Sequence, residues 1–523
     1  MSEARPATLL DQLPQSARLT DACSGQSMDL VQIRQLVSAW QHQLATLGSK
    51  RIVLLSPGNL EWALLDLACI DANLVLVPLP TFISQAQFDH VLALLQPDLI
   101  IGSSEFSPAV GGSLQLTAGQ FQPAGQFRQF WLYQSVVRST QVELPAGCQK
   151  ITFTSGSTGT PKGVCLSAAS QWQVAQSLVG RIALAQPRHL AVLPLSTLLE
   201  NIAGIYAPLL AGGEVLLTDE ANRGFAGSAL AEPALLLQLI SSTRPDSLIL
   251  VPELLQLLVL ASQRGWQAPD SLRFIAVGGA KVAPALLQQA AAVGLPVFQG
   301  YGLSECGSVV ALSTQHAASA DTLETLQSVG QPLPHLQVRI TAGELWVKTP
   351  FLGYLGAAEQ ATAPADWVAT GDLAELDAKG ELRILGRKKN LLISSFGRNI
   401  HPEWVEAELL KNALLQQAVV FGDAQPYCVA LLYCQDNNIS DQQIEQWLAA
   451  VNRSLPDYAR LQQFHRLTQP LTAANGCLTT NQRPKRDVIA NQYAAELAAM
   501  YPAVGSIQGS ISAVGHSQQF AGV

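Results

Sequence analysis

The chain has 523 residues, room for two or three domains of about 150 residues each, and 48% of its residues are hydrophobic while 13% are charged. A disordered chain is excluded, because so apolar a sequence buries enough surface to offset the entropy of ordering. The 31 basic and 39 acidic side chains give a net charge of −8 and form no basic stripe, so we expect no nucleic-acid partner.

The eight cysteines are scattered, without CxxC spacing or nearby histidine pairs. This pattern indicates mostly buried thiols rather than a disulfide framework or a zinc site. The first ten residues lack a basic region followed by an apolar core, and Pro252 and Glu253 interrupt the richest apolar run, 248–261. We therefore expect a soluble, cytoplasmic protein with no integral membrane segment. The sequence does not indicate an oligomeric state.

The first periodic segment predicts a helix with Ser27 as its N-cap, apolar residues at helical spacing from Leu30 to Leu47, and Gly48 as its end. Strands and helices then alternate. The predicted strands are 51–55, 74–77 and 98–101, and the predicted helices are 60–73 and 85–95. Such alternation predicts parallel sheets covered by helices on both faces.

The same alternation continues through residues 151–298, with strand-like runs at 190–195, 214–218, 248–251 and 273–277. Ligands of such sheets bind at the carboxyl ends of the strands. After about residue 325 the sequence changes to short strands with glycine turns, and a smaller mixed segment covers 388–501. The last residues lack periodicity and are rich in Gly, Ser and Gln, which predicts a disordered tail at 503–523.

The most informative stretch is ITFTSGSTGTPKGVCLS, residues 151–167, in which an apolar strand leads into a Gly/Ser/Thr loop and a lysine. Glycines let successive backbone N–H groups point at an anion, hydroxyls add donors, and the lysine adds a positive charge. Its candidate phosphate-binding residues are Thr154, Ser155, Gly156, Ser157, Thr158, Gly159 and Lys162. It is not a Walker P-loop, because Gly163 follows the lysine. The alternative is a flexible surface turn.

Four further motifs follow in order: Val277-Gly278-Gly279-Ala280, Tyr301-Gly302-Leu303-Ser304-Glu305, Thr370-Gly371-Asp372-Leu373 and Gly386-Arg387-Lys388-Lys389. Together with the Gly/Ser loop they resemble the adenylate-forming superfamily, which includes acyl-CoA synthetases, peptide-synthetase adenylation domains and luciferases. The resemblance covers roughly residues 20–500. It implies an α/β fold: a large N-terminal domain, 1–386, of doubly wound mixed and parallel sheets with a small β-barrel-like part, and a small, mobile α+β domain, 391–502, after a hinge at 387–390.

The middle motifs also have a physical interpretation of their own. Small residues at 278–280, after a predicted strand, let a flat base lie on the backbone, although a tight turn explains them equally well. Tyr301 can stack on that base, and Ser304 can donate to a phosphate oxygen. Glu305 offers a hard oxygen ligand for Mg²⁺. In isolation, an ordinary loop would explain residues 301–305 better.

The later motifs supply a carboxylate and several cations. Asp372 can accept hydrogen bonds from both ribose hydroxyls, and Arg387 can contact ribose or phosphate as a bidentate donor. A turn-forming Asp and a surface salt bridge are the respective alternatives. The resemblance implies that Lys389 is the pivot of the hinge. It also implies that Gly397 leaves room for a pantetheine arm at the thioester-forming site, where an ordinary hairpin is the alternative.

The segment NGCLTTNQRPKRD, near the C-terminus, departs from the family pattern. Members usually place a lysine there that stabilises charge developing during adenylation. The segment resembles the ending of long-chain acyl-CoA synthetases, and in that register Arg483 takes the position of the lysine while Lys485 follows two residues later. Three interpretations are open: Lys485 takes the role of the family's lysine, Arg483 replaces that lysine, or adenylation is weak. We favour Lys485, because arginine is not an equivalent point charge. Lys411 is better explained as part of a solvated helix face.

A second departure lies at LPLSTLLENIAG, residues 193–204, where many relatives carry an aromatic residue or histidine and this chain has Ser196 and Thr197. The resemblance places this segment beside the acyl pocket. Its apolar residues favour an aliphatic acid, and no counterpart is visible of the Asp that peptide-synthetase domains use to hold an α-amino group.

We therefore expect an enzyme that uses ATP and Mg²⁺ to convert a carboxylic acid, aliphatic or fatty, to an acyl-AMP with release of pyrophosphate. The acyl group then passes to a thiol, either coenzyme A or the phosphopantetheine of an acyl carrier protein. Two alternatives remain open. The chain is a catalytically weak protein that binds ATP or an acyl-adenylate, or it is an adenylating ligase whose acceptor is an amine or a hydroxyl.

Overall fold

The computed structural model describes residues 9–103, 116, 120–136, 142–154, 162–227, 229–319, 326–355, 367–393, 399–412, 414–423, 425, 427–436, 438–479 and 482–501. Contacts divide the chain into two compact units, Met1–Leu385 and Gly386–Val523. Each unit contains hydrophobic clusters of its own. The predicted phosphate loop at 155–161, Gly397 and the predicted tail at 503–523 lie outside the described residues.

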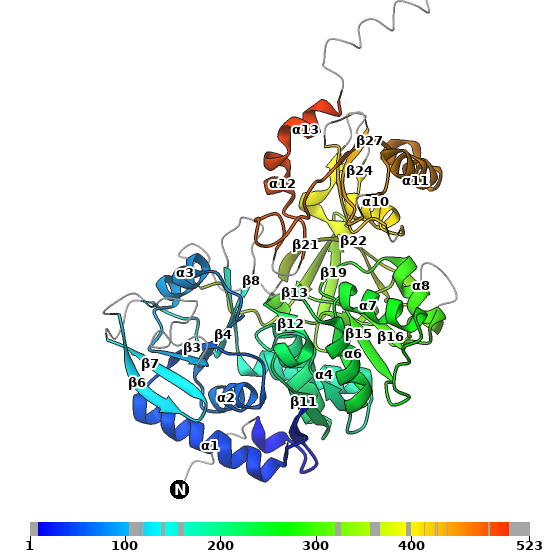
Figure 1. The fold of residues 1–523 in the computed structure, drawn as a ribbon. Helices are drawn as coiled ribbons and strands as arrows, with labels where there is room; N and C mark the ends of the chain where they lie inside the picture. Colours follow the sequence, from blue (N-terminus) through cyan, green and yellow to red (C-terminus); the bar gives the residue numbers. More distant parts are fainter. Residues whose placement is uncertain are drawn as a thin grey trace, which may run out of the picture. The chain divides into compact units, whose positions relative to one another are not determined.

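A seven-stranded sheet forms the first part of the large unit (Figure 1). Its strands, in spatial order, are β6 (Phe121–Phe127), β7 (Phe130–Ser135), β5 (Leu99–Ser103), β3 (Arg51–Leu55), β4 (Val75–Leu79), β8 (Lys150–Thr154) and β9 (Lys162–Leu166). Strands β5, β3, β4 and β8 are parallel, whereas β8 and β9 form an antiparallel hairpin. Its helices are α1 (Leu30–Leu47), α2 (Leu60–Asp71) and α3 (Gln85–Leu95).

Helices cover both faces of this sheet because alternate residues of β3 point to opposite sides. Ile52 and Leu54 pack in the cluster that contains residues of α1 and α2. Val53 and Leu55 pack in the cluster that contains residues of α3. Every one of these four side chains is buried, as expected for a strand in a sheet covered on both faces.

A nine-stranded sheet forms the second part of the unit. Its order is β18 (Gln331–Pro332), β17 (Ala311–Leu312), β16 (Val297–Tyr301), β15 (Phe274–Val277), β14 (Ser247–Leu250), β10 (Arg188–Leu190), β11 (Glu214–Leu217), β1 (Arg18–Asp21) and β2 (Ser27–Met28). The strands from β16 to β1 are parallel, and the edge strands are antiparallel. The helices are α4 (Ala168–Ile182), a π-helix (Glu200–Tyr206), α5 (Ala207–Leu210), α6 (Pro233–Thr243), α7 (Pro252–Gln263) and α8 (Pro284–Ala292).

Short antiparallel strands follow, as the glycine-turn texture predicted. They form a four-stranded sheet of β19 (Gln337–Thr341), β20 (Glu344–Lys348), β21 (Trp367–Leu376) and β22 (Leu382–Arg387). A separate hairpin pairs β12 (Phe225–Ala226) with β13 (Ala229–Leu230). The expected combination of mixed sheets with a small antiparallel part is confirmed.

The small unit is α+β. Its strands are β23 (Leu392–Ile393) and β24 (Asn399–Ile400) in one hairpin, and β25 (Gln417–Phe421), β26 (Cys428–Tyr433) and β27 (Leu461–Arg466) in one sheet. Its helices are α10 (Pro402–Leu409), α11 (Asp441–Ser454), α12 (Arg486–Gln492) and α13 (Ala494–Ala499).

Two local predictions were wrong. Ser27 lies in β2, and the N-cap of α1 is Asp29, whose side chain accepts from Gln32 N while the Gln32 side chain accepts from Asp29 N. The run at 190–195 contributes only its first residue to β10, because the chain turns from the sheet toward the π-helix. The cysteine prediction is confirmed: all are free thiols, and only Cys23 is exposed. Within the described residues, no helix is long and apolar enough to cross a bilayer.

Candidate active site

The two central motifs lie at the carboxyl ends of neighbouring parallel strands. Residues Gly278–Ala280 follow β15, and Gly302 follows β16. Gly279 has a φ of +78°, which favours glycine. A Cβ at Gly302 would lie 1.6 Å from Ser308 O, and one at Gly278 would lie 3.1 Å from Gly300 O. The backbone is therefore packed tightly at this edge, which explains why the residues there are glycines.

Tyr301 and Asp372, which are 71 residues apart in the sequence, are in direct contact. The Tyr301 hydroxyl donates to Asp372 Oδ2 at 2.5 Å. Asp372 lies on β21 and is buried, and its backbone N–H donates to Thr370 Oγ1 at 3.1 Å. The tertiary structure thus joins the predicted base-stacking residue to the predicted ribose-binding carboxylate.

Tyr354, which sequence reasoning missed, contacts both Glu305 and Lys162. The Tyr354 hydroxyl donates to Glu305 Oε1 at 2.7 Å. Lys162 Nζ lies 5.5 Å from the centroid of the Tyr354 ring, within reach of a cation–π contact. Burial, followed by the Glu305 carboxylate, raises the pKa of Tyr354 above its ordinary value. The hydroxyl therefore stays protonated and acts as a donor.

Backbone pairing places Tyr354 beside β9. Leu355 N donates to Gly163 O at 2.7 Å, and Cys165 N donates to Gly353 O at 3.0 Å. A Cβ at Gly163 would lie 3.0 Å from both Ile151 Cγ2 and Leu355 Cβ. The only local signal in the sequence is one tyrosine after a glycine, and a pairing across almost two hundred residues cannot be read from that.

The arrangement around Glu305 suits a magnesium ion. Among the described residues, no three His, Cys, Asp or Glu side chains form a metal-binding group. Mg²⁺ does not need one, because it commonly binds through one or two carboxylates together with waters and substrate phosphates. Glu305 offers one carboxylate. Lys162 adds a positive charge close to the tyrosine that binds Glu305.

The predicted hinge residues lie at the start of the small unit. Arg387 ends β22, and Lys389 lies in a 3-10 turn, Lys388–Asn390. Burial lowers the pKa of Lys389; the carboxylate of Asp487 raises it, and Arg387 lowers it further. Asn390 Nδ2 donates to Glu403 Oε1 at 2.7 Å. The turn is therefore in electrostatic contact with α12 and hydrogen-bonded to α10.

Arg483 and Lys485 lie two residues apart, just before α12. Thr479 N donates to Arg483 O, and Lys485 N donates to Cys477 O, each at 2.8 Å. Lys485 is the N-cap residue of α12. The next residue, Arg486, binds both carboxylate oxygens of buried Glu406 at 2.6 and 2.7 Å. The backbone that carries both candidate cations is therefore fixed by these hydrogen bonds and by the Arg486–Glu406 pair, and it holds Arg483 and Lys485 alike. Lys411 lies in the turn that follows α10, so its predicted position on a helix face was wrong; its Nζ pairs with Glu408, near the end of that helix, at 2.5 Å.

Matches to two protein families define the class of protein. Residues 26–355 match the AMP-binding enzyme family, and residues 389–505 match the AMP-binding enzyme C-terminal domain. The chain belongs to this family, and it is an enzyme of the AMP-forming acid–thiol ligase type.

Particular relatives differ in their acids. The 2-succinylbenzoate–CoA ligase of Enterococcus faecalis is 28% identical over 459 residues, which cover 83% of this chain and 89% of the relative. A long-chain-fatty-acid–CoA ligase of Mycobacterium bovis is 32% identical over 253 residues, 43% of this chain and 41% of the relative. The structure of the o-succinylbenzoate coenzyme A synthetase of Bacillus subtilis in complex with ATP and magnesium ion has a TM-score of 0.72 at 22% identity, and the match covers 92% of this chain and 99% of that chain.

Proposed function

We propose that this chain activates a carboxylic acid with ATP and Mg²⁺ to give an acyl-AMP and pyrophosphate, and then transfers the acyl group to a thiol. The observation that carries the proposal is a group of contacts beside the glycines packed at the strand ends. Tyr301 donates a hydrogen bond to Asp372. Tyr354 donates to Glu305 and lies near Lys162. These groups offer what a magnesium nucleotide requires: a base platform, a carboxylate for ribose, a cation for phosphate and a hard oxygen ligand.

In this proposal each group has a separate task. The backbone at 278–280 and the Tyr301 ring frame the adenine, and Asp372 and Arg387 hold the ribose. The loop at 155–159 with Lys162 holds the β- and γ-phosphates, and Ser304 donates to a phosphate oxygen. Glu305 holds Mg²⁺, which neutralises charge on the phosphates when it is bound. Lys485, or Arg483 in its place, stabilises charge that develops as the acid carboxylate attacks the α-phosphate.

We propose an aliphatic or fatty acid as the substrate. The support is the apolar segment that contains Leu193, Leu195 and Leu198, all buried. The relatives act on 2-succinylbenzoate in one case and on long-chain fatty acids in another, so an aryl acid is the competing class. The simplest thiol is coenzyme A, which the names of these relatives contain, and the phosphopantetheine of a carrier protein would offer the same thiol.

The test is acid-dependent release of pyrophosphate from ATP and Mg²⁺, with aliphatic and aryl acids of increasing size, in the presence and absence of coenzyme A. We expect release with an aliphatic acid and acceleration by coenzyme A. ATP binding without release for any acid would contradict the ligase proposal, and release that depends on an amine or hydroxyl instead of a thiol would contradict the proposed acceptor.

The same assay assigns the cation near the C-terminus. Lys485→Ala is expected to lower kcat for pyrophosphate release by about a hundredfold or more, while Arg483→Ala has a much smaller effect. ATP binding, measured by calorimetry, checks that each variant retains the nucleotide site. The reverse order of the two effects would move the role to Arg483.

A further inference from the structure

The backbone changes its attachment from the large unit to the small unit within β22. Both backbone groups of Leu382 are hydrogen-bonded to the large unit. Leu385 O, three residues later, accepts from Lys281 Nζ of the same unit at 3.1 Å. The division of the chain by contacts falls directly after Leu385. The contacts of the segment 386–390 therefore show how the small unit holds the start of its own chain.

Glu403 touches both ends of this segment. Its Oε1 accepts from Asn390 Nδ2 at 2.7 Å. At the other end, a Cβ at Gly386 would lie 3.1 Å from Glu403 Oε2 and 3.0 Å from His401 Nδ1. A side chain at residue 386 would therefore press against both groups, and the glycine lets the backbone approach them closely.

The position of Glu403 is fixed by the helix that carries it. Glu403 lies in the first turn of α10. One turn later, the buried side chain of Glu406 binds Arg486 with both carboxylate oxygens and accepts from Val420 N at 2.7 Å. These contacts tie α10 to β25 and to the start of α12. Glu403 therefore belongs to a part of the small unit that buried polar contacts hold together.

One oxygen of Glu403 is left unsatisfied by this arrangement. Oε2 is buried and has no hydrogen-bond partner within the part of the chain that the structure describes. A buried polar atom without a partner costs free energy. Water could hydrate Oε2 if Gly386 moved away, and this gain would offset part of the lost contact. The arrangement thus favours one conformation of the segment without making it permanent, as a part that exchanges between two conformations requires.

We propose that Glu403 is a positioning residue of the predicted hinge and holds Gly386 and Asn390 in the arrangement seen here. Lys389 lies between these two residues, so a rotation of the backbone at Lys389 moves one relative to the other. Glu403 must then release one of its two contacts. The use of this motion in two half-reactions rests on the proposed ligase function, which the inference deepens by adding a residue outside the hinge segment.

The experiment measures the rate of trypsin cleavage after Arg387, Lys388 and Lys389 in the full-length protein, with the fragments identified by mass spectrometry. Cleavage of a folded chain requires local opening of the backbone, so its rate reports how firmly the segment is held. Glu403→Ala removes the acceptor for Asn390 Nδ2 and is expected to raise this rate about fivefold. Glu403→Gln keeps an oxygen for that hydrogen bond and should stay within about twofold of the wild type.

Gly386→Ala tests the packing contact at the other end. The added methyl group crowds Glu403 Oε2 and is expected to raise hinge cleavage about fivefold in the wild-type background. In the Glu403→Ala background the space left by the shortened side chain accommodates the methyl group, so the same substitution should add less than about twofold.

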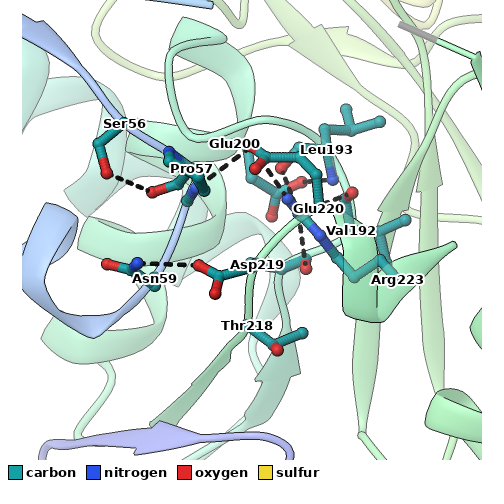
Figure 2. Close-up of polar contacts among 12 residues, drawn as sticks. Ser56, Pro57, Asn59, Val192, Leu193, Glu200, Thr218, Asp219, Glu220 and Arg223 are labelled. Atoms are coloured by element: carbon teal, nitrogen blue, oxygen red, sulfur yellow. Dashed lines mark hydrogen bonds and ion pairs between the residues drawn. The ribbon is translucent and has the colours of Figure 1, made fainter. Parts of the chain in front are cut away.

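The matched control is a hydrogen bond of the same kind in the large unit. Asp219 Oδ1 accepts from Asn59 Nδ2 at 2.8 Å (Figure 2). Asp219→Ala therefore also removes a carboxylate acceptor from an asparagine amide. Hinge cleavage in this variant is expected to stay within about twofold of the wild type, because distant sites act independently.

Wild-type hinge cleavage in Glu403→Ala would overturn the proposal. A parallel rise of cleavage after Arg453 and Arg460, elsewhere in the small unit, would also overturn it, because general destabilisation predicts that result. Glu403→Ala is further expected to change the ratio of the rates of acyl-AMP formation and thioester formation by about threefold, and an unchanged ratio would contradict a role in the working hinge. If the wild type releases no pyrophosphate with any acid, the ligase function fails, while the cleavage rates still decide whether Glu403 holds the segment.

Discussion

At the scale of single residues, Tyr354 shows how one side chain can serve two charged groups. Its hydroxyl donates to Glu305, and its ring lies near the ammonium group of Lys162. A carboxylate binds a metal ion more tightly when a hydrogen-bond donor fixes its orientation, because a side chain that is free to rotate must be ordered when the metal binds. We therefore propose that Tyr354 positions Glu305, the proposed Mg²⁺ ligand.

Tyr354→Phe removes the donor and keeps the ring. We expect the Mg²⁺ concentration for half-maximal pyrophosphate release to rise roughly tenfold, with little change in kcat at saturating Mg²⁺. The measurement is a Mg²⁺ titration of initial rates at saturating ATP and acid. Tyr354→Leu, which also removes the ring near Lys162, is expected to raise KM for ATP in addition. A wild-type Mg²⁺ dependence of Tyr354→Phe would show that Glu305 needs no such partner.

At the scale of single elements, α1 shows how a helix start is decided by reciprocal hydrogen bonds. Asp29 accepts from Gln32 N at 2.9 Å, and Gln32 Oε1 accepts from Asp29 N at 3.0 Å. This capping box satisfies two backbone N–H groups that the helix itself cannot pair. Ser27, two residues earlier, instead hydrogen-bonds with its hydroxyl to Thr20 Oγ1 at 2.9 Å, across β1 and β2, and Thr20 in turn donates to Glu214 Oε1.

Asp29→Ala should therefore destabilise the large unit by about 1 kcal/mol, whereas Ser27→Ala should cost less than about 0.5 kcal/mol. The measurement is the midpoint of thermal unfolding of each full-length variant, determined by scanning calorimetry. The midpoints of the two variants suffice, because they differ only in the predicted and the observed cap. A larger loss in Ser27→Ala would contradict the observed capping box.

At the scale of the whole molecule, the chain divides between Leu385 and Gly386, just before residues 387–390, which the sequence resemblance predicts to be a hinge. We propose that Lys389 is the pivot. Lys389 lies in the first turn of a short 3-10 helix, where proline is tolerated, and the fixed φ of proline would restrict the backbone rotations that a pivot needs.

Lys389→Pro is expected to preserve one half-reaction and abolish the other, since a ligase that forms an adenylate and then a thioester must rearrange between the two. The measurements are acid-dependent pyrophosphate exchange for the first half-reaction and thioester formation from a supplied acyl-AMP for the second. Lys389→Ala, which changes the charge but not the backbone, should keep both. Retention of both by the proline variant would contradict the hinge.

Much of the fold follows from local sequence. Alternating apolar strands and amphipathic helices specify parallel sheets covered on both faces, because each element must bury an apolar side. The glycines at 278, 279 and 302 likewise mark positions where the backbone itself excludes a side chain. The motif order was sufficient to recognise the family, since each motif is a continuous stretch whose chemistry is read in place.

Contacts between distant segments were decided by the tertiary structure alone. Tyr301 meets Asp372, Tyr354 meets Glu305, and Lys150 meets Asp66, Asn201 and Tyr206 only because sheets bring remote strands together. The contact partner of a tyrosine or lysine cannot be predicted from the local sequence, because strand order and register determine which residues come together. Sequence alone therefore determined the family and the residues of its motifs, whereas the tertiary structure decided which side chains hold those motifs in place.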